Sequence, residues 1–130
     1  MKIARLGEPG REVPVVIAAD AQGVERCYDA SSVTGTVDGA FLAGDGVARL
    51  RAAVADGELP LLEGAEALRI GSPVARPNNV ICIGMNYAAH AAESGALPPT
   101  IPVVFLKPNN TVAGPSVDEA KSAEKLVRPP

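Results

Sequence analysis

The sequence predicts an α+β fold rich in β-structure, in which a small domain precedes the start of a second one. The first observation is a set of three short segments rich in Val and Ile, separated by turn residues. The second is a single amphipathic segment with helical spacing. The third is a pair of continuous apolar runs in the second half of the chain. The strands and the helix are predicted at residues 2–6, 13–19, 24–28, 47–56, 80–83 and 103–106.

The N-terminal half is expected to begin as a β-meander. Turn residues at Gly7–Gly10 and Asp20–Gly23 separate the three predicted strands. Apolar residues then recur at helical spacing over residues 47–56, which predicts an amphipathic helix. Residues 59–62 and 67–70 are predicted to be short extended pieces.

Proline and asparagine gather at residues 73–79 and predict a domain boundary there. The chain is therefore expected to contain a small domain of residues 1–76 and the first segment of a second domain, residues 77–115. Residues 116–130 differ in composition. Capping-box spacing at their start favours a marginal helix, and the terminal prolines stop it, so a helical and a disordered tail both stay open.

Composition excludes several classes of function. The 12 basic and 15 acidic residues give a net charge of −3, and no basic cluster exists to bind nucleic acid. The apolar runs are far shorter than the roughly 20 residues of a membrane span, and the first residues enter a strand instead of a signal peptide. A cytoplasmic protein is expected. Cys27 and Cys82 show no metal or redox spacing and are expected to be buried thiols.

The one segment that indicates chemistry surrounds His90, the only histidine. An apolar run turns through Asn86 and Tyr87 into an alanine-rich helix, predicted at about 87–94, and Glu93 follows His90 by three positions. Residues three apart are neighbours on a helix surface, so the carboxylate can orient the imidazole as a general base. The spacing alone favours an ordinary surface ion pair or a solvated helix face over a catalytic pair, because such pairs are common on helices.

The surrounding residues make the pattern more specific. Over residues 77–115 the chain resembles the fumarylacetoacetate hydrolase family. Residues 1–76 also look like the small N-terminal domain that precedes the catalytic domain in many bacterial members. The resemblance implies that residues 77–115 begin a mixed-sheet β-roll. It is carried by Ile81-Cys82-Ile83-Gly84-Met85-Asn86-Tyr87, His90, Glu93, Phe105-Leu106-Lys107-Pro108 and Gly114-Pro115.

The resemblance implies a metal-dependent enzyme that acts on 2-oxo or β-diketo acids as a carbon–carbon bond hydrolase, an isomerase or a lyase. His90 and Glu93 would form the catalytic dyad. Lys107, Asn86 and Tyr87 would contact the substrate, with Lys107 facing the same pocket as the dyad. Each of these three has a structural alternative: Lys107 as a solvated strand end, Asn86 as a helix cap, and Tyr87 as a half-buried residue against the helix.

The chain departs from the family at the metal site. Members hold Mg²⁺ or Mn²⁺ with two acidic residues one position apart and a later Asp, all beyond the Gly-Pro pair. The acidic residues beyond Pro115 are Asp118, Glu119 and Glu124, which do not have this spacing. No metal ligands are therefore expected in this chain. It is interpreted as a family member truncated before those ligands, or alternatively as a noncatalytic fragment or oligomerisation module. A metal-independent hydrolase is a more distant possibility, because no Ser or Cys nucleophile adjoins His90.

The same interpretation predicts self-association, as a homodimer or another oligomer. The apolar runs at 80–83 and 103–106 are typical of central strands in a sheet covered on both faces. If the neighbouring strands are missing, the edges and apolar faces of these two strands stay uncovered.

Overall fold

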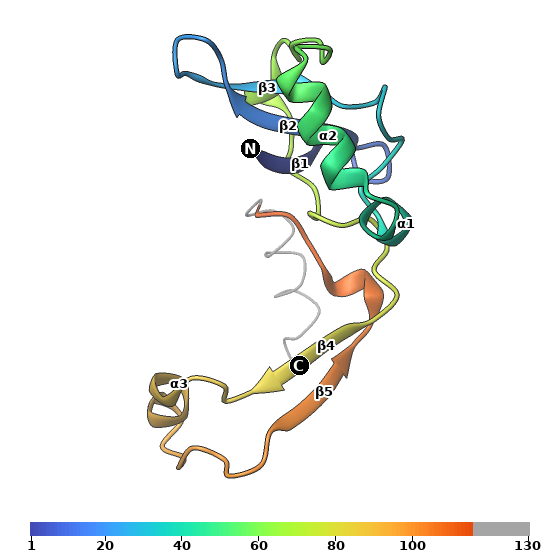
Figure 1. The fold of residues 1–130 in the computed structure, drawn as a ribbon. Helices are drawn as coiled ribbons and strands as arrows, with labels where there is room; N and C mark the ends of the chain where they lie inside the picture. Colours follow the sequence, from blue (N-terminus) through green and yellow to red (C-terminus); the bar gives the residue numbers. More distant parts are fainter. Residues whose placement is uncertain (116–130) are drawn as a thin grey trace, which may run out of the picture. The chain divides into compact units, whose positions relative to one another are not determined.

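The computed structural model describes residues 1–115, which form two compact units. Unit 1 contains Met1–Arg76 and the described residues from Val112 onward, and unit 2 is Pro77–Thr111. The chain has the α+β, β-rich class that the sequence predicts, with one antiparallel sheet in each unit and a few short helices (Figure 1). The predicted tail at 116–130 lies outside the described residues.

Unit 1 contains a three-stranded antiparallel sheet with the order β1-β2-β3. The strands are β1 (Lys2–Leu6), β2 (Val13–Ala19) and β3 (Glu25–Asp29), within one residue of their predicted bounds. The turn between β2 and β3 is held by Asp20, whose carboxylate accepts hydrogen bonds from the backbone N–H groups of Val24 and Gln22. These bonds, with that of Val24 the strongest, lower the pKa of Asp20.

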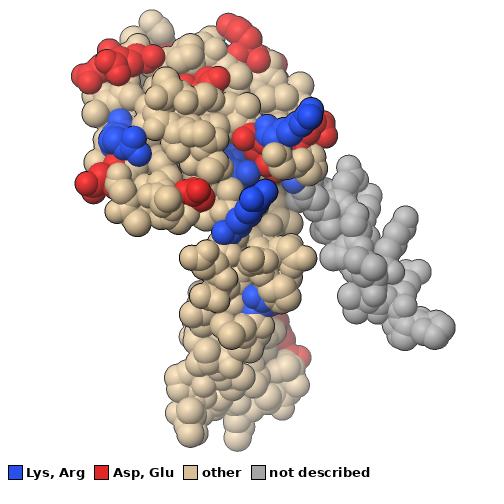
Figure 2. Space-filling model, turned by 90° about the vertical axis from the view of Figure 1, so that its right-hand side faces the viewer, with Lys and Arg blue, Asp and Glu red and all other residues tan. Residues whose placement is uncertain are grey.

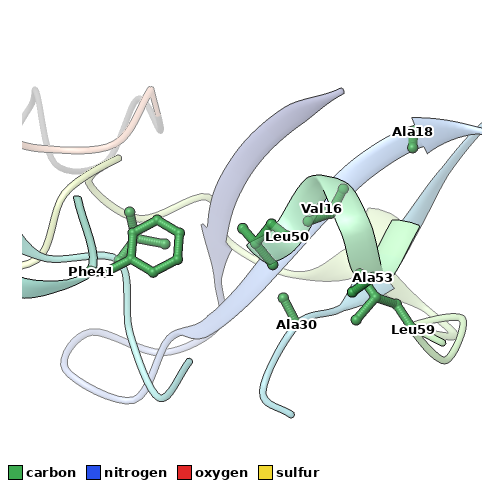
Figure 3. Close-up of a cluster of buried hydrophobic side chains, with 8 residues drawn as sticks. Val16, Ala18, Ala30, Phe41, Leu50, Ala53 and Leu59 are labelled. Atoms are coloured by element: carbon green, nitrogen blue, oxygen red, sulfur yellow. The ribbon is translucent and has the colours of Figure 1, made fainter. Parts of the chain in front are cut away.

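One face of this sheet is covered by α1 (Gly39–Ala43) and α2 (Gly46–Ala55). Leu50 of α2 is completely buried against Val16 of β2, and Phe41 of α1 closes one end of the same cluster (Figure 3). Burying a Leu or Phe side chain contributes about 1.5–3 kcal/mol, so this cluster is the main stabilising core of unit 1.

The sequence predicts no helix at residues 39–43, and the structure places α1 there. Asp38 caps this helix by accepting a hydrogen bond from the N–H of Phe41 at 2.9 Å. A five-residue helix is shorter than two turns, so it has no apolar periodicity to detect. The Phe41 ring lies so close to Gly46 that any side chain at position 46 would collide with it.

The second face of the sheet is crossed by the segment that follows α2. Ala65 of this segment packs with Val15 and Leu6, which explains why β2 is buried on both faces. The predicted extended pieces at 59–62 and 67–70 reduce to two isolated bridges, from Leu61 to β3 and from Ile70 to β1. The short 3-10 helix Ala65–Ala67 takes the start of the second piece, so that prediction was wrong there.

A buried ion network joins β1 to the chain that leads out of unit 1. Arg5 donates to the Glu12 carboxylate at 2.8 Å, and Arg69 donates to the other oxygen of Glu12 at 3.2 Å. Arg5 also donates to the Ser72 hydroxyl at 3.0 Å. The side chains of Arg5 and Glu12 are only 9% and 6% exposed, so the two charges depend on each other for compensation.

Unit 2 is a two-stranded antiparallel hairpin with a long connection. β4 (Val80–Gly84) pairs with β5 (Val103–Lys107), and α3 (Ala88–Glu93) lies in the connection between them. A short 3-10 helix, Asn109–Thr111, follows β5. Glu93 and Lys107 are the only acidic and basic residues in unit 2. In Figure 2 the charged side chains accordingly gather on unit 1.

The hairpin strands form where the sequence predicts them, and their apolar side chains are exposed within the described residues, as expected if the neighbouring strands are missing. The cross-strand pairs Ile81–Leu106 and Ile83–Val104 lie on one face of the hairpin. Their side chains are 66%, 69%, 45% and 60% exposed, in the order named. An isolated two-stranded hairpin is marginally stable at best, so this apolar face needs a cover. The sequence predicts that both cysteines are buried, but Cys27 and Cys82 are only half-buried.

We expect the 130-residue chain to self-associate through this face, because pairing would cover exposed aliphatic side chains and unpaired strand edges. Size-exclusion chromatography with light scattering should give a mass above 13.3 kDa. Leu106→Lys should shift the equilibrium toward monomer. Leu97→Lys is the control, because Leu97 is 90% exposed and lies outside the sheet. A well-folded wild-type monomer at all concentrations would contradict this prediction.

None of the helices within residues 1–115 combines the length and the apolar character needed to cross a membrane.

Candidate functional site

The helix α3 follows β4 through a tight turn at Met85. Met85 has φ of 46°, in the left-handed region that few non-glycine residues adopt. Tyr87 then takes an extended conformation at the N-cap position, with no side-chain hydrogen bond to the helix. This geometry turns the chain out of the strand and starts a helix of six residues, inside the predicted 87–94.

The structural alternatives for Asn86 and Tyr87 are wrong. Tyr87, and not Asn86, occupies the N-cap position. The Tyr87 side chain is 74% exposed, so it does not pack against the helix as a half-buried residue. Both residues are exposed beside α3, which leaves their side chains free to contact a ligand.

The structure brings His90 and Glu93 together on α3. Their side chains approach to 3.9 Å between Nδ1 of His90 and Oε2 of Glu93. This is an ion-pair distance and is too long for a hydrogen bond. The two side chains are 64% and 78% exposed, so solvent and ligands reach both of them. Catalytic hydrogen bonds often shorten only when the substrate binds, and the pair can close further by side-chain rotation.

Lys107 lies at the other end of the hairpin from this pair. It pairs with Val80, whereas α3 follows Gly84, which pairs with Val103. Val80 and Gly84 are four positions apart along β4, or about 13 Å at the usual rise per residue. Within the described part of the chain, Lys107 and the His90–Glu93 pair therefore do not converge. Their shared pocket stays a prediction.

A groove of about 580 Å³ lies in unit 1, and it contains none of the predicted site residues. Its lining includes Ile17 and Cys27 of the sheet and Leu61, Leu68 and Ile70 of the crossing segment. Charged side chains line it as well, namely Glu25, Arg26, Glu63 and Glu66. It has no histidine, because the only histidine is on α3. The groove therefore offers apolar contact but no general base of the kind that α3 carries.

The residues of unit 2 do not fit Mg²⁺ or Mn²⁺. A hard divalent cation takes about six oxygen ligands, usually including carboxylates. Glu93 is the only carboxylate in unit 2, and residues 1–115 contain no group of three or more His, Cys, Asp or Glu side chains that could hold a metal ion. Any divalent cation at this site would need ligands from beyond these residues.

One element of the site escaped the sequence prediction, namely the C-terminal cap of α3. Ser94 and Gly95 follow Glu93, and Gly95 has φ of 71°. The available signal was the Ser-Gly pair directly after an alanine-rich helix, since glycine commonly ends helices in this conformation.

Comparison with known proteins finds relatives but no matching family model. A provisionally named hydrolase of Burkholderia multivorans is 41% identical over 127 residues, which is 96% of this chain and 43% of the relative. A similarly named protein of Burkholderia cenocepacia is also 41% identical, and one of Burkholderia lata is 39% identical, over the same shares of both chains. The chain thus spans less than half the length of the curated relatives it matches. The names of these relatives describe them as hydrolases and state no substrate.

Proposed function

We propose that this chain forms part of a hydrolase of the fumarylacetoacetate hydrolase type, which cleaves a carbon–carbon bond in 2-oxo or β-diketo acids. The observation that carries the proposal is the exposed His90–Glu93 pair, directly after a strand whose residues resemble that family. The provisional hydrolase names of the relatives support the broad class.

In the proposed reaction His90 acts as the general base. Its neutral imidazole takes a proton from water, and the resulting hydroxide oxygen bonds to the carbonyl carbon of the substrate. The bond from that carbon to its neighbour then breaks, and the electron pair stays on the 2-oxo fragment as an enolate. The imidazolium returns its proton to the enolate carbon. Glu93 stabilises the imidazolium between these two steps because its carboxylate lies 3.9 Å from Nδ1.

Asn86, Tyr87 and Lys107 are the proposed substrate contacts. Asn86 and Tyr87 are exposed next to α3, so they can donate or accept hydrogen bonds at the substrate oxygens. Lys107 is the only Lys or Arg in unit 2 and would attract a substrate carboxylate. Because Lys107 lies at the far end of the hairpin, this role requires a substrate or a neighbouring segment that connects the two ends.

The Mg²⁺ or Mn²⁺ that the resemblance implies would come with ligands from outside the described residues. No step of the proposed reaction is assigned to it. The lengths of the relatives support this arrangement, since the Burkholderia multivorans relative is more than twice as long as the segment that matches this chain.

A noncatalytic module is the second candidate. The observation that favours it is the single carboxylate of unit 2, which cannot complete a metal site. Calorimetric titration of the 130-residue chain with Mg²⁺ tests this second candidate. Saturable binding would contradict it, because the chain would then hold a metal ion by itself.

The proposed function is tested in a chimera. This chain replaces the matching segment of the Burkholderia multivorans relative, so that the rest of the relative supplies the missing length. We expect the chimera to hydrolyse acylpyruvates in the presence of Mg²⁺ or Mn²⁺. The reaction is monitored by the loss of the absorbance of the substrate's enol form. The unmodified relative is the control for substrate choice. If the relative turns over an acylpyruvate and a folded chimera does not, the proposal is wrong.

A further inference from the structure

We infer that Ser94 is a positioning residue for the His90–Glu93 pair. By capping the last turn of α3, it keeps these two side chains facing each other. This inference rests on the proposed function for its catalytic meaning. It is carried independently by the hydrogen bonds at the end of the helix.

The helix α3 has little else to stabilise it. It is six residues long, and isolated helices shorter than about 12 residues are marginal in water. Its N-cap residue, Tyr87, makes no side-chain capping bond, and Ala91 is its only buried residue. A helix this short frays at each of its two ends. The residues at its C-terminal end therefore decide how often the last turn is formed.

Ser94 satisfies the carbonyl groups of that turn. Its hydroxyl oxygen lies 2.9 Å from the carbonyl oxygen of Ala91 and 3.2 Å from that of His90, and its single hydroxyl hydrogen can be shared between them. The backbone N–H of Ser94 donates to the carbonyl of His90 at 3.3 Å. The backbone of the proposed base is thus bound twice by the same residue.

Gly95 completes the cap. Its left-handed conformation turns the chain so that its own N–H donates to the carbonyl of Ala92 at 3.0 Å. The N–H of Ala96 donates to the carbonyl of Ala91, also at 3.0 Å. This is the arrangement by which glycine commonly ends helices. Ser94 adds a side-chain bond to an otherwise backbone-only cap.

The consequence for the pair follows from the position of Glu93. It is the final residue of α3, so fraying at the C-terminal end removes it from the helix first. His90 and Glu93 face each other only while the three-residue spacing keeps helical geometry. When the last turn opens, the carboxylate moves away from Nδ1 and the imidazole loses its orienting partner. Ser94 therefore acts on His90 through the helix, without touching the substrate.

The test uses nuclear magnetic resonance on the 130-residue chain, in which His90 gives the only histidine ring signals. Ser94→Ala should raise the frayed population of the last turn by roughly two- to tenfold, the effect of losing one ordinary hydrogen bond. Two changes are expected. The Cα chemical shifts of residues 90–93 should move toward random-coil values, and the nuclear Overhauser effect between the His90 ring and the Glu93 side chain should weaken. Ser94→Thr keeps the hydroxyl and should restore both.

A double-mutant comparison separates positioning from general helix stability. Glu93→Gln should shift the His90 ring signals in the wild-type background, and this response should shrink at least twofold in the Ser94→Ala background. Thr111→Ala is the matched control, because the Thr111 hydroxyl makes a similar bond, 2.7 Å to the carbonyl of Pro108, at a distance from α3 in the sequence. That variant should leave the response unchanged.

An equal response of His90 to Glu93→Gln with and without the Ser94 hydroxyl would overturn the inference, and so would failure of Ser94→Thr to rescue. If the resonances of folded unit 1 disappear in Ser94→Ala, that variant has unfolded as a whole. The comparison of Ser94→Thr with the wild type then decides the result. The outcome is distinct from that of the proposed function. A chimera without turnover removes the catalytic role of His90, while the resonance data still decide whether Ser94 sets the pair.

Discussion

Replacing His90 with alanine is expected to lower the kcat/KM of the chimera for its acylpyruvate substrate by about 10²- to 10⁴-fold, the usual contribution of a general base. The reason is that His90 is the only imidazole in the chain and is 64% exposed beside Glu93. Steady-state kinetics of the purified variant measure the effect. KM should change much less than kcat, because the imidazole acts on water and not on substrate binding.

Two further variants make this result specific. Glu93→Gln keeps the size of the side chain but removes the charge that stabilises the imidazolium, so its activity should fall between wild type and His90→Ala. Glu66→Gln is the matched control, since Glu66 is an exposed glutamate of unit 1 outside the proposed site. Full activity in His90→Ala would show that the base lies elsewhere and would refute the assigned roles.

Replacing Glu12 with glutamine is expected to lower the free energy of unfolding of the chain by about 3–5 kcal/mol, as for other broken buried ion pairs. Glu12 receives hydrogen bonds from both Arg5 and Arg69, and its side chain is only 6% exposed. Glutamine leaves the Arg5 guanidinium buried without a counter-charge. Urea denaturation followed by circular dichroism measures the loss.

The control for this variant is a surface ion pair in the same sheet. Glu25 pairs with Lys2 at 2.8 Å, but the two side chains are 57% and 66% exposed. Glu25→Gln should therefore cost less than about 1 kcal/mol. If Glu12→Gln and Glu25→Gln lower the free energy of unfolding equally, the buried ion network at Glu12 stabilises unit 1 no more than a surface ion pair does, and the prediction is wrong.

Glu12 also gives stability a pH dependence of known sign. Burial alone would raise its pKa, but its own backbone N–H, the charge of Arg5, and the bonds from Arg69 and Gly10 outweigh burial and lower the pKa. The folded state therefore holds the ionised form more strongly than the unfolded chain. The resulting stability is fully present above the ordinary glutamate value of 4.5 and is lost as pH falls through the lowered pKa. Glu12→Gln should flatten this acid-side slope.

Much of the backbone could be predicted because its signals are local. The strands β1, β2 and β3 follow from Val- and Ile-rich runs between turn residues, and α2 follows from helical spacing. The helix α1 could not be predicted, because its five residues are held by the Asp38 cap and by packing of Phe41. Those contacts depend on tertiary structure and leave no periodic pattern.

The same distinction holds for the candidate site. The spacing of His90 and Glu93 predicts their approach, because a helix converts three positions into one surface neighbourhood. The relation of Lys107 to that pair could not be predicted from spacing. It depends on the strand register, which pairs Lys107 with Val80 at the opposite end of the hairpin. The exposed state of Tyr87 was left open by the sequence, since it depends on what packs against α3.

The sequence by itself therefore determined the α+β class, the main strands, and the meeting of an imidazole with a carboxylate on one helix. Each of these depends on residues close together in the chain, where backbone geometry alone sets the contact. Only the tertiary structure decided that Glu12 joins two arginines far apart in sequence, and that Lys107 lies at the opposite end of the hairpin from the His90–Glu93 pair. Both depend on which distant segments pack or pair with one another, and local spacing does not set that.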